Sequence, residues 1–157
     1  MTAWRVAAAM AAIGLVVAYA VGSGRWVSTG STWYQSLDQP AWQPPPAVFG
    51  LAWTYNFLAL AVVGVAIALV GSGPRVAVFL GVLAVTIALA IAWAYLFYVP
   101  HSLVPSAVAL TACALLTFVP LAVAFQERSW LGILLVPYQL WLLVAASLAW
   151  GYVALAR

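Results

Sequence analysis

The sequence predicts an all-α membrane protein, a bundle of five transmembrane helices in which a long first loop forms a lid. Hydrophobic residues make up 68% of the chain and charged residues only 4%, whereas a soluble domain carries about 25% charged residues. Between residues 76 and 125 there is no Asp, Glu, Lys or Arg. That stretch is long enough for two spanning helices of roughly 20 residues each. Both observations predict a multi-pass integral membrane protein, in the cell membrane if the source is prokaryotic.

Five apolar runs are long enough to cross a bilayer, and we expect them to form a single domain, 1–157. They cover residues 3–22, 46–70, 75–99, 103–125 and 130–156. The first run resembles a signal peptide, but it exceeds the roughly 7–15 apolar residues of such peptides, so we expect it to be retained. Pro137 is expected to kink the last helix. Because the later connections are short, helices adjacent in sequence are expected to be neighbours in space.

The loop at residues 23–45 has an unusual composition, and we expect it to cover a pocket between the helices. Thr32 and Gln35 fit a capping box and predict a short helical turn over 33–37, which Pro40 would end. Pro46 suits the first turn of the next helix. The residues expected to act as the lid are Trp33, Trp42, Pro44 and Pro45. The alternative is an aromatic belt at the membrane interface.

Aromatic residues recur at helical spacing in three of the predicted spans. Steps of three and four residues place Tyr138, Trp141, Ala145, Leu148 and Tyr152 on one face of the last span. The other two groups are Trp93 with Phe97, and Trp53 with Asn56 and Phe57. Asn56 is a polar side chain inside a span and should face the bundle. Aromatic walls with few polar groups suit a flat apolar ligand. The alternative is that the rings pack helix against helix or face lipid.

The chain has few ionisable side chains from which a catalytic or metal site could be built. It contains one His, one Cys and two acidic residues, too few for a metal site with about three or four ligands. His101 lies at a helix junction, where we expect a solvated side chain and not a haem ligand. The five arginines are scattered singly, so nucleic acid is not an expected partner. We predict no metal, no required cofactor and no catalytic residue that acts as an acid or base.

Two further patterns concern partners other than the lipid bilayer. Small residues recur along the span 75–99, at Ala77, Gly81, Ala84, Ala88 and Ala92. They allow close helix approach, in a homodimer or within one bundle. Leu148, Tyr152 and Arg157 occur in the order of a proposed cholesterol motif, which marks a candidate sterol contact.

The loop and the last span carry motifs of a known family. The loop residues, followed by two aromatic residues of the next span, resemble the signature of the TspO / translocator protein family, the tryptophan-rich sensory proteins: Trp33-Tyr34, Leu37, Pro40, Trp42, Pro44-Pro45, Phe49 and Trp53. A second match is Val136-Pro137-Tyr138 with Trp141 and Ala145, and Trp93, Phe97 and Tyr98 match more loosely. The resemblance covers nearly the whole chain.

The resemblance implies a five-helix receptor or sensor, often a homodimer, with a pocket beneath the first loop. It implies a porphyrin ligand such as protoporphyrin IX or haem, and in some members a sterol or a benzodiazepine-type drug. A light-dependent porphyrin-degrading enzyme, with Trp53 and Trp141 as its reactive residues, and a porphyrin or sterol transporter are the implied alternatives. By motif position and helix face together, the expected ligand-binding residues are Tyr34, Trp53, Asn56, Trp93, Phe97, Tyr138, Trp141 and Ala145. Polar or proline positions of the family are replaced by Gln39, Ala90, Tyr95 and Ala149, which leaves fewer partners for ligand propionates.

Overall fold

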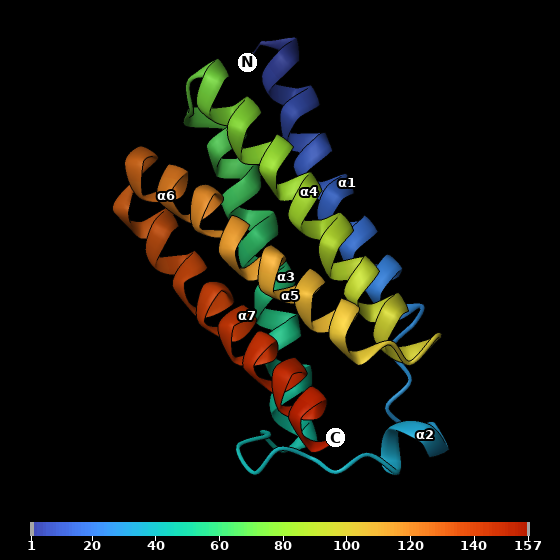
Figure 1. The fold of residues 1–157 in the computed structure, drawn as a ribbon. Coiled ribbons are helices and arrows are strands. Elements are labelled where there is room, and N and C mark those ends of the chain that lie inside the picture. Colours follow the sequence, from blue (N-terminus) through green and yellow to red (C-terminus); the bar gives the residue numbers. More distant parts are fainter. Residues whose placement is uncertain (1, 157) are drawn as a thin grey trace.

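The chain is folded into an all-helical bundle. The computed structural model describes residues 2–156, and within them five stretches of helix are long and apolar enough to cross a membrane (Figure 1). They are α1 (Ala3–Gly24), α3 (Pro46–Val70), α4 (Gly73–Tyr98), the pair α5 (Leu103–Leu116) and α6 (Phe118–Glu127), and α7 (Ser129–Leu155). A one-turn helix, α2 (Thr32–Gln35), lies in the loop between α1 and α3. The predicted five-helix membrane protein is confirmed.

Prolines shape the helix ends. Pro46 begins α3 as predicted, since a proline in the first turn gives up no intrahelical hydrogen bond. The predicted fourth span is interrupted at Thr117, between α5 and α6. The cause is Pro120, which has no N–H to donate to the preceding turn and therefore takes a position in the first turn of a new helix. By contrast, α7 continues through Pro137.

The order of the helices around the bundle differs from their order in the chain. α1 packs against both α3 and α4, α7 packs against α3 and α5, and α5 packs against α4. The expectation that sequence neighbours are spatial neighbours is wrong for α3 and α4, which touch only sparsely because α1 lies against both. A Cβ on Gly64 of α3 would lie 2.9 Å from the Cβ of Ala12, so α1 approaches α3 closely.

The two ends of the bundle differ in character. At the end that carries the N-terminus (Figure 1), the Arg5 guanidinium donates to the carbonyl oxygens of Ala68 and Leu69, which end α3. Arg75 and Glu127 form an ion pair of 3.2 Å that joins α4 to α6. At the opposite end lie the C-terminal part of α7 and the loop with α2 (Figure 1). We call this loop, residues 25–45, the lid.

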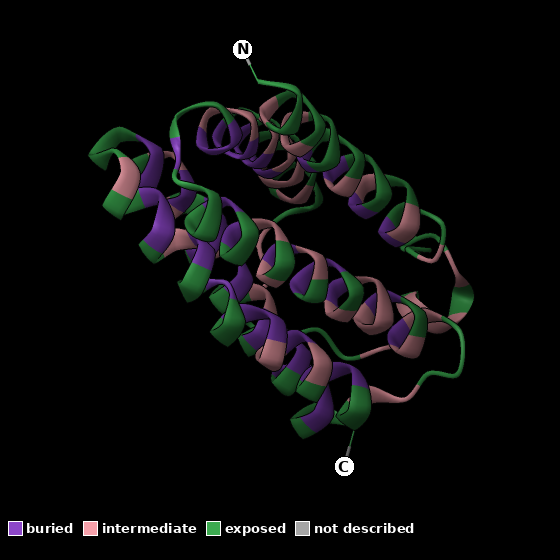
Figure 2. Cartoon of the chain, turned by 90° about the horizontal axis from the view of Figure 1, so that it is seen from above, coloured by how far each residue is buried: buried purple, intermediate pink, exposed green. Residues whose placement is uncertain are grey.

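The outer surface matches a lipid environment. Figure 2 shows the buried residues turned toward the middle of the bundle and the exposed ones turned outward. The outward side chains are largely apolar and include Leu51, which is 73% exposed, and Val21, which is 67% exposed. A surface of this kind would aggregate in water but is favoured by acyl chains, so the protein is a multi-pass integral membrane protein.

Candidate functional site: an aromatic cavity beneath the lid

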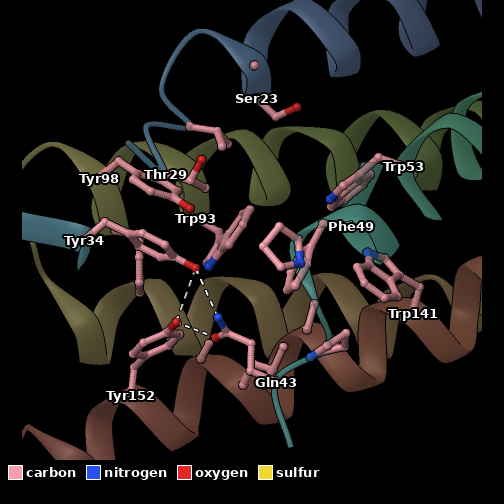
Figure 3. Close-up of a pocket in the computed structure, with 18 of the residues that line it drawn as sticks. Ser23, Thr29, Tyr34, Gln43, Phe49, Trp53, Trp93, Tyr98, Trp141 and Tyr152 are labelled. Atoms are coloured by element: carbon pink, nitrogen blue, oxygen red, sulfur yellow. Dashed lines mark hydrogen bonds between the residues drawn. The ribbon is translucent and has the colours of Figure 1, made fainter. Parts of the chain in front are cut away.

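A cavity of about 730 Å³ opens at the lid end of the bundle (Figure 3). Its walls come from α1, α3, α4 and α7, and the lid contributes Tyr34 and the run Gln43-Pro44-Pro45. Small-molecule sites in proteins are typically about 300–1,000 Å³, so this cavity has room for a ligand of some size.

Six of the eight predicted ligand-binding residues line the cavity: Tyr34, Trp53, Trp93, Phe97, Trp141 and Ala145. Asn56 and Tyr138 do not, since they lie deeper in the bundle with 1% and 2% of their surface exposed. Asn56 faces the bundle, as predicted, but Phe57, not Asn56, shares the cavity wall with Trp53. Tyr138 lies almost one turn nearer the start of α7 than Trp141, which places it beyond the aromatic wall.

The aromatic wall is built from rings that also pack on one another. The rings of Trp53 and Phe57 are stacked with centroids 5.6 Å apart, and the Tyr19 ring meets both edge-on. Phe49 and Trp141 form an edge-to-face pair at 5.2 Å, which joins α3 to α7. Helix packing and cavity lining are therefore not alternatives here, because the same rings do both.

Two indole donors on the wall have no partner. Among residues 2–156, the Nε1 atoms of Trp93 and Trp141 are buried and make no hydrogen bond. A buried donor without a partner costs about 1–3 kcal/mol. Unpaired side-chain atoms are also buried away from the cavity, on Tyr19, Asn56, Tyr138 and Gln139. An unpaired buried donor therefore does not by itself mark a ligand site.

The polar end of the cavity is a cluster of three side chains that joins the lid to α7 (Figure 3). The Tyr152 hydroxyl donates to Oε1 of Gln43, and Nε2 of Gln43 donates to the Tyr34 hydroxyl at 3.4 Å. The hydroxyl oxygens of Tyr152 and Tyr34 lie 3.3 Å apart. Both the oxygen and the NH₂ group of the Gln43 amide are thus hydrogen-bonded. The cluster holds this part of the lid over the cavity.

Two tryptophans seat the lid from outside the cavity. The Trp33 ring is stacked on the His101 ring at 3.8 Å, and it meets Phe97 edge-on. Trp42 is 56% exposed and donates from Nε1 to the Ser147 hydroxyl at 3.2 Å. Of the four predicted lid residues, Pro44 and Pro45 therefore line the cavity, whereas Trp33 and Trp42 anchor the lid to α4 and α7.

The predicted helix cap and the predicted bounds of the helical turn in the lid were wrong. Ser31, not Thr32, caps α2, and its hydroxyl accepts from the Tyr34 N–H at 3.2 Å. The helical turn spans 32–35 instead of 33–37. Two adjacent hydroxyl residues offered two cap positions, and the sequence alone did not choose between them. His101 is exposed, as expected, and has a φ of 56°.

Several lining residues were missed by sequence reasoning, among them Gln43, Phe49 and Tyr98. Gln43 carried one signal, as the polar residue between Trp42 and three prolines. Two residues of the proposed sterol motif, Leu148 and Tyr152, line the cavity and do not face lipid, and Arg157 lies outside the described residues. Within residues 2–156, no three His, Cys, Asp or Glu side chains gather as a metal site would require.

Comparison with known proteins gives a consistent result. Residues 6–155 match the model of the TspO/MBR family. The chain is 33% identical over 118 residues to a tryptophan-rich sensory protein of Cereibacter sphaeroides, covering 74% of this chain and 72% of the relative. It is 29% identical over 139 residues to the protein CrtK of Rhodobacter capsulatus, covering 87% and 86% of the two chains.

Proposed function

Because this chain belongs to the TspO/MBR family, we propose that it is a membrane receptor or sensor that binds a porphyrin-type tetrapyrrole in the lidded cavity. The observation that carries the proposal is a single cavity of about 730 Å³ lined by rings from α3, α4 and α7. A porphyrin is a flat, largely apolar macrocycle. Aromatic stacking adds about 0.5–1.5 kcal/mol for each ring pair beyond the burial of area.

The contacts of the lid with the helices are those expected of a receptor that encloses its ligand. It is joined to α7 through the Tyr34, Gln43 and Tyr152 cluster and to the end of α4 through Trp33 and His101. These contacts connect residues far apart in the chain, so a ligand that moves the lid changes the packing of two helices. The name of the relative from Cereibacter sphaeroides, a sensory protein, agrees with a signalling role.

The experiment is a titration of the purified protein in detergent with protoporphyrin IX, followed by tryptophan fluorescence. We expect saturable quenching, and a dissociation constant at least about tenfold higher for Trp141→Ala, since loss of a buried aromatic contact of about 1.4 kcal/mol changes the dissociation constant tenfold. Trp130→Ala is the matched control, because Trp130 lies on the same helix but is exposed at the far end. Absence of saturable quenching, or equal affinity in the two variants, would overturn the proposal.

A further inference from the structure

The cavity wall is uncharged. Among the residues of 2–156 that line it, none is Asp, Glu, Lys, Arg or His. The polar groups are hydroxyls, the indole N–H groups of the lining tryptophans, and the side-chain amides of Gln35, Gln39 and Gln43, which all come from the lid. The deep part, around Phe49, Trp53 and Trp141, is aromatic. The cavity is therefore amphipathic, with an apolar body and a polar but neutral rim.

The charged and titratable side chains near the lid do not change this picture. The Arg25 guanidinium is exposed and lies over the ring of Trp26, with 5.3 Å from Cζ to the ring centroid. Asp38 precedes Gln39 in the lid and is exposed, so it adds negative charge close to the rim. His101 is exposed and stacked on Trp33. None of the three lines the cavity.

This distribution penalises an anionic ligand. No lining residue in the described chain offers a cation to a carboxylate at the rim, and the exposed carboxylate of Asp38 beside Gln39 adds repulsion between like charges. A neutral ester, amide, carbonyl or hydroxyl has a much smaller cost of burial and needs only one or two hydrogen bonds. The rim can provide these bonds, because an amide both donates and accepts.

Two of the three rim amides are available. Gln43 uses its oxygen for Tyr152 and its NH₂ group for Tyr34. Within the described part of the chain, the side chains of Gln35 and Gln39 make no hydrogen bond, and both are exposed at the cavity edge. A ligand whose apolar body fills the aromatic part would bring its polar end to these two amides.

We propose that the cavity selects uncharged ligands: flat polycyclic molecules with a neutral oxygen-bearing end at the glutamine rim. This inference rests on the proposed function and names its ligand class. A tetrapyrrole with esterified or amidated side chains is the preferred ligand, and the same macrocycle with free carboxylates is discriminated against.

The test compares protoporphyrin IX with its dimethyl ester, which differ only in two carboxylates, in fluorescence titrations corrected for partition into empty micelles. We expect the ester to bind the wild type at least about tenfold more tightly, which corresponds to about 1.4 kcal/mol. Gln39→Lys puts a cation at the rim and should reduce this preference about tenfold by favouring the free acid. Gln126→Lys adds the same charge at the opposite end of the bundle, where Gln126 is exposed, and should leave the preference unchanged. Micelle partition is common to all variants and cancels when they are compared.

A second probe pair separates this inference from the proposed function. Pyrenemethanol and pyrenecarboxylate are flat polycycles that differ in charge but are not tetrapyrroles. If neither porphyrin binds while the neutral pyrene is preferred, the porphyrin assignment fails and neutral selection stands. If the free acids bind as tightly as their neutral counterparts, or if Gln39→Lys and Gln126→Lys give the same preference, neutral selection is overturned. Neutral selection is also overturned if none of the four probes binds.

Discussion

Gly151 of α7 occupies a position where the lid and a membrane helix come into direct contact. A Cβ at this residue would lie 2.6 Å from Cγ of Pro40 and 2.9 Å from Cζ2 of Trp42. Pro40 is buried, and its rigid ring cannot move aside without moving the loop. The sequence marked Trp42 as a lid residue and Pro40 as the end of the helical turn in the same loop. Nothing in it indicated that a glycine more than a hundred residues later contacts both.

We therefore expect Gly151→Ala to loosen the lid. Overpacking of a tight contact costs about 1–3 kcal/mol, and here the lid can relieve it by moving away from α7. Hydrogen exchange of the backbone amides at residues 32–43 should become faster, while the spans keep their protection. The control is Gly30→Ala, which lies in the same loop but where a Cβ would meet nothing within 4 Å. Equal exchange in both variants would show that Gly151 does not seat the lid.

At the scale of elements, small residues let α1 pack closely against α3. A Cβ on Gly64 would lie 2.9 Å from the Ala12 Cβ and 3.9 Å from its Cα, so the backbone of α1 itself would have to shift. Hydrophobic spacing identified both helices correctly, because each run is long and apolar. It did not indicate that α1 packs against α3 and α4 alike, since their shared contact surface depends on matched small residues in separate segments.

Gly64→Ala is expected to lower the thermal unfolding midpoint in detergent. Within a helix, alanine is intrinsically favoured over glycine by about 1 kcal/mol, so a loss of stability would reveal the steric cost at the α1–α3 contact. Gly14→Ala is the control, because Gly14 lies in α1 where an added Cβ would meet nothing within 4 Å. Its midpoint should stay the same or rise. A midpoint for Gly64→Ala at or above that of Gly14→Ala would contradict the close contact.

At the scale of the whole molecule, part of the small-residue stripe of α4 faces outward. Ala77, Gly81 and Ala88 are exposed, whereas Ala84 and Ala92 are half-buried. The exposed part of the stripe is thus open to a partner in the bilayer. We propose that it is the contact surface of a homodimer, because small residues allow the close approach by which helices associate in a bilayer.

Replacement of Gly81 by leucine should separate this dimer. The side chain would hold the two α4 helices apart, so size exclusion with light scattering should show a monomer for Gly81→Leu and a dimer for the wild type. Gly14→Leu makes the same change at an open position on α1 and should remain dimeric. A dimer in both variants would show that the dimer contact lies elsewhere. A monomeric wild type would show that there is no such dimer.

Local and compositional features were readable from the chain alone. The near absence of charge required spanning segments. Continuous apolar runs without alternating polar positions required these segments to be helices, which pair their backbone groups internally. Proline signals placed the start of α3 correctly. Periodicity grouped Trp53 with Asn56 and Phe57, and Tyr138 with Trp141, since residues three and four apart share a helix face.

Tertiary packing then separated the members of those groups. Trp53 and Phe57 line the cavity while Asn56 is buried beside them, and Trp141 lines it while Tyr138 lies deeper. One face of a helix can border both the cavity and the packed interior of the bundle. The neighbouring helices decide which residues on that face line the cavity. The glycine contacts at 64 and 151 and the pairing of Trp33 with His101 likewise join distant segments. Sequence spacing describes a helix one turn at a time, whereas a cavity exists only between helices, so its shape followed from their arrangement around the bundle.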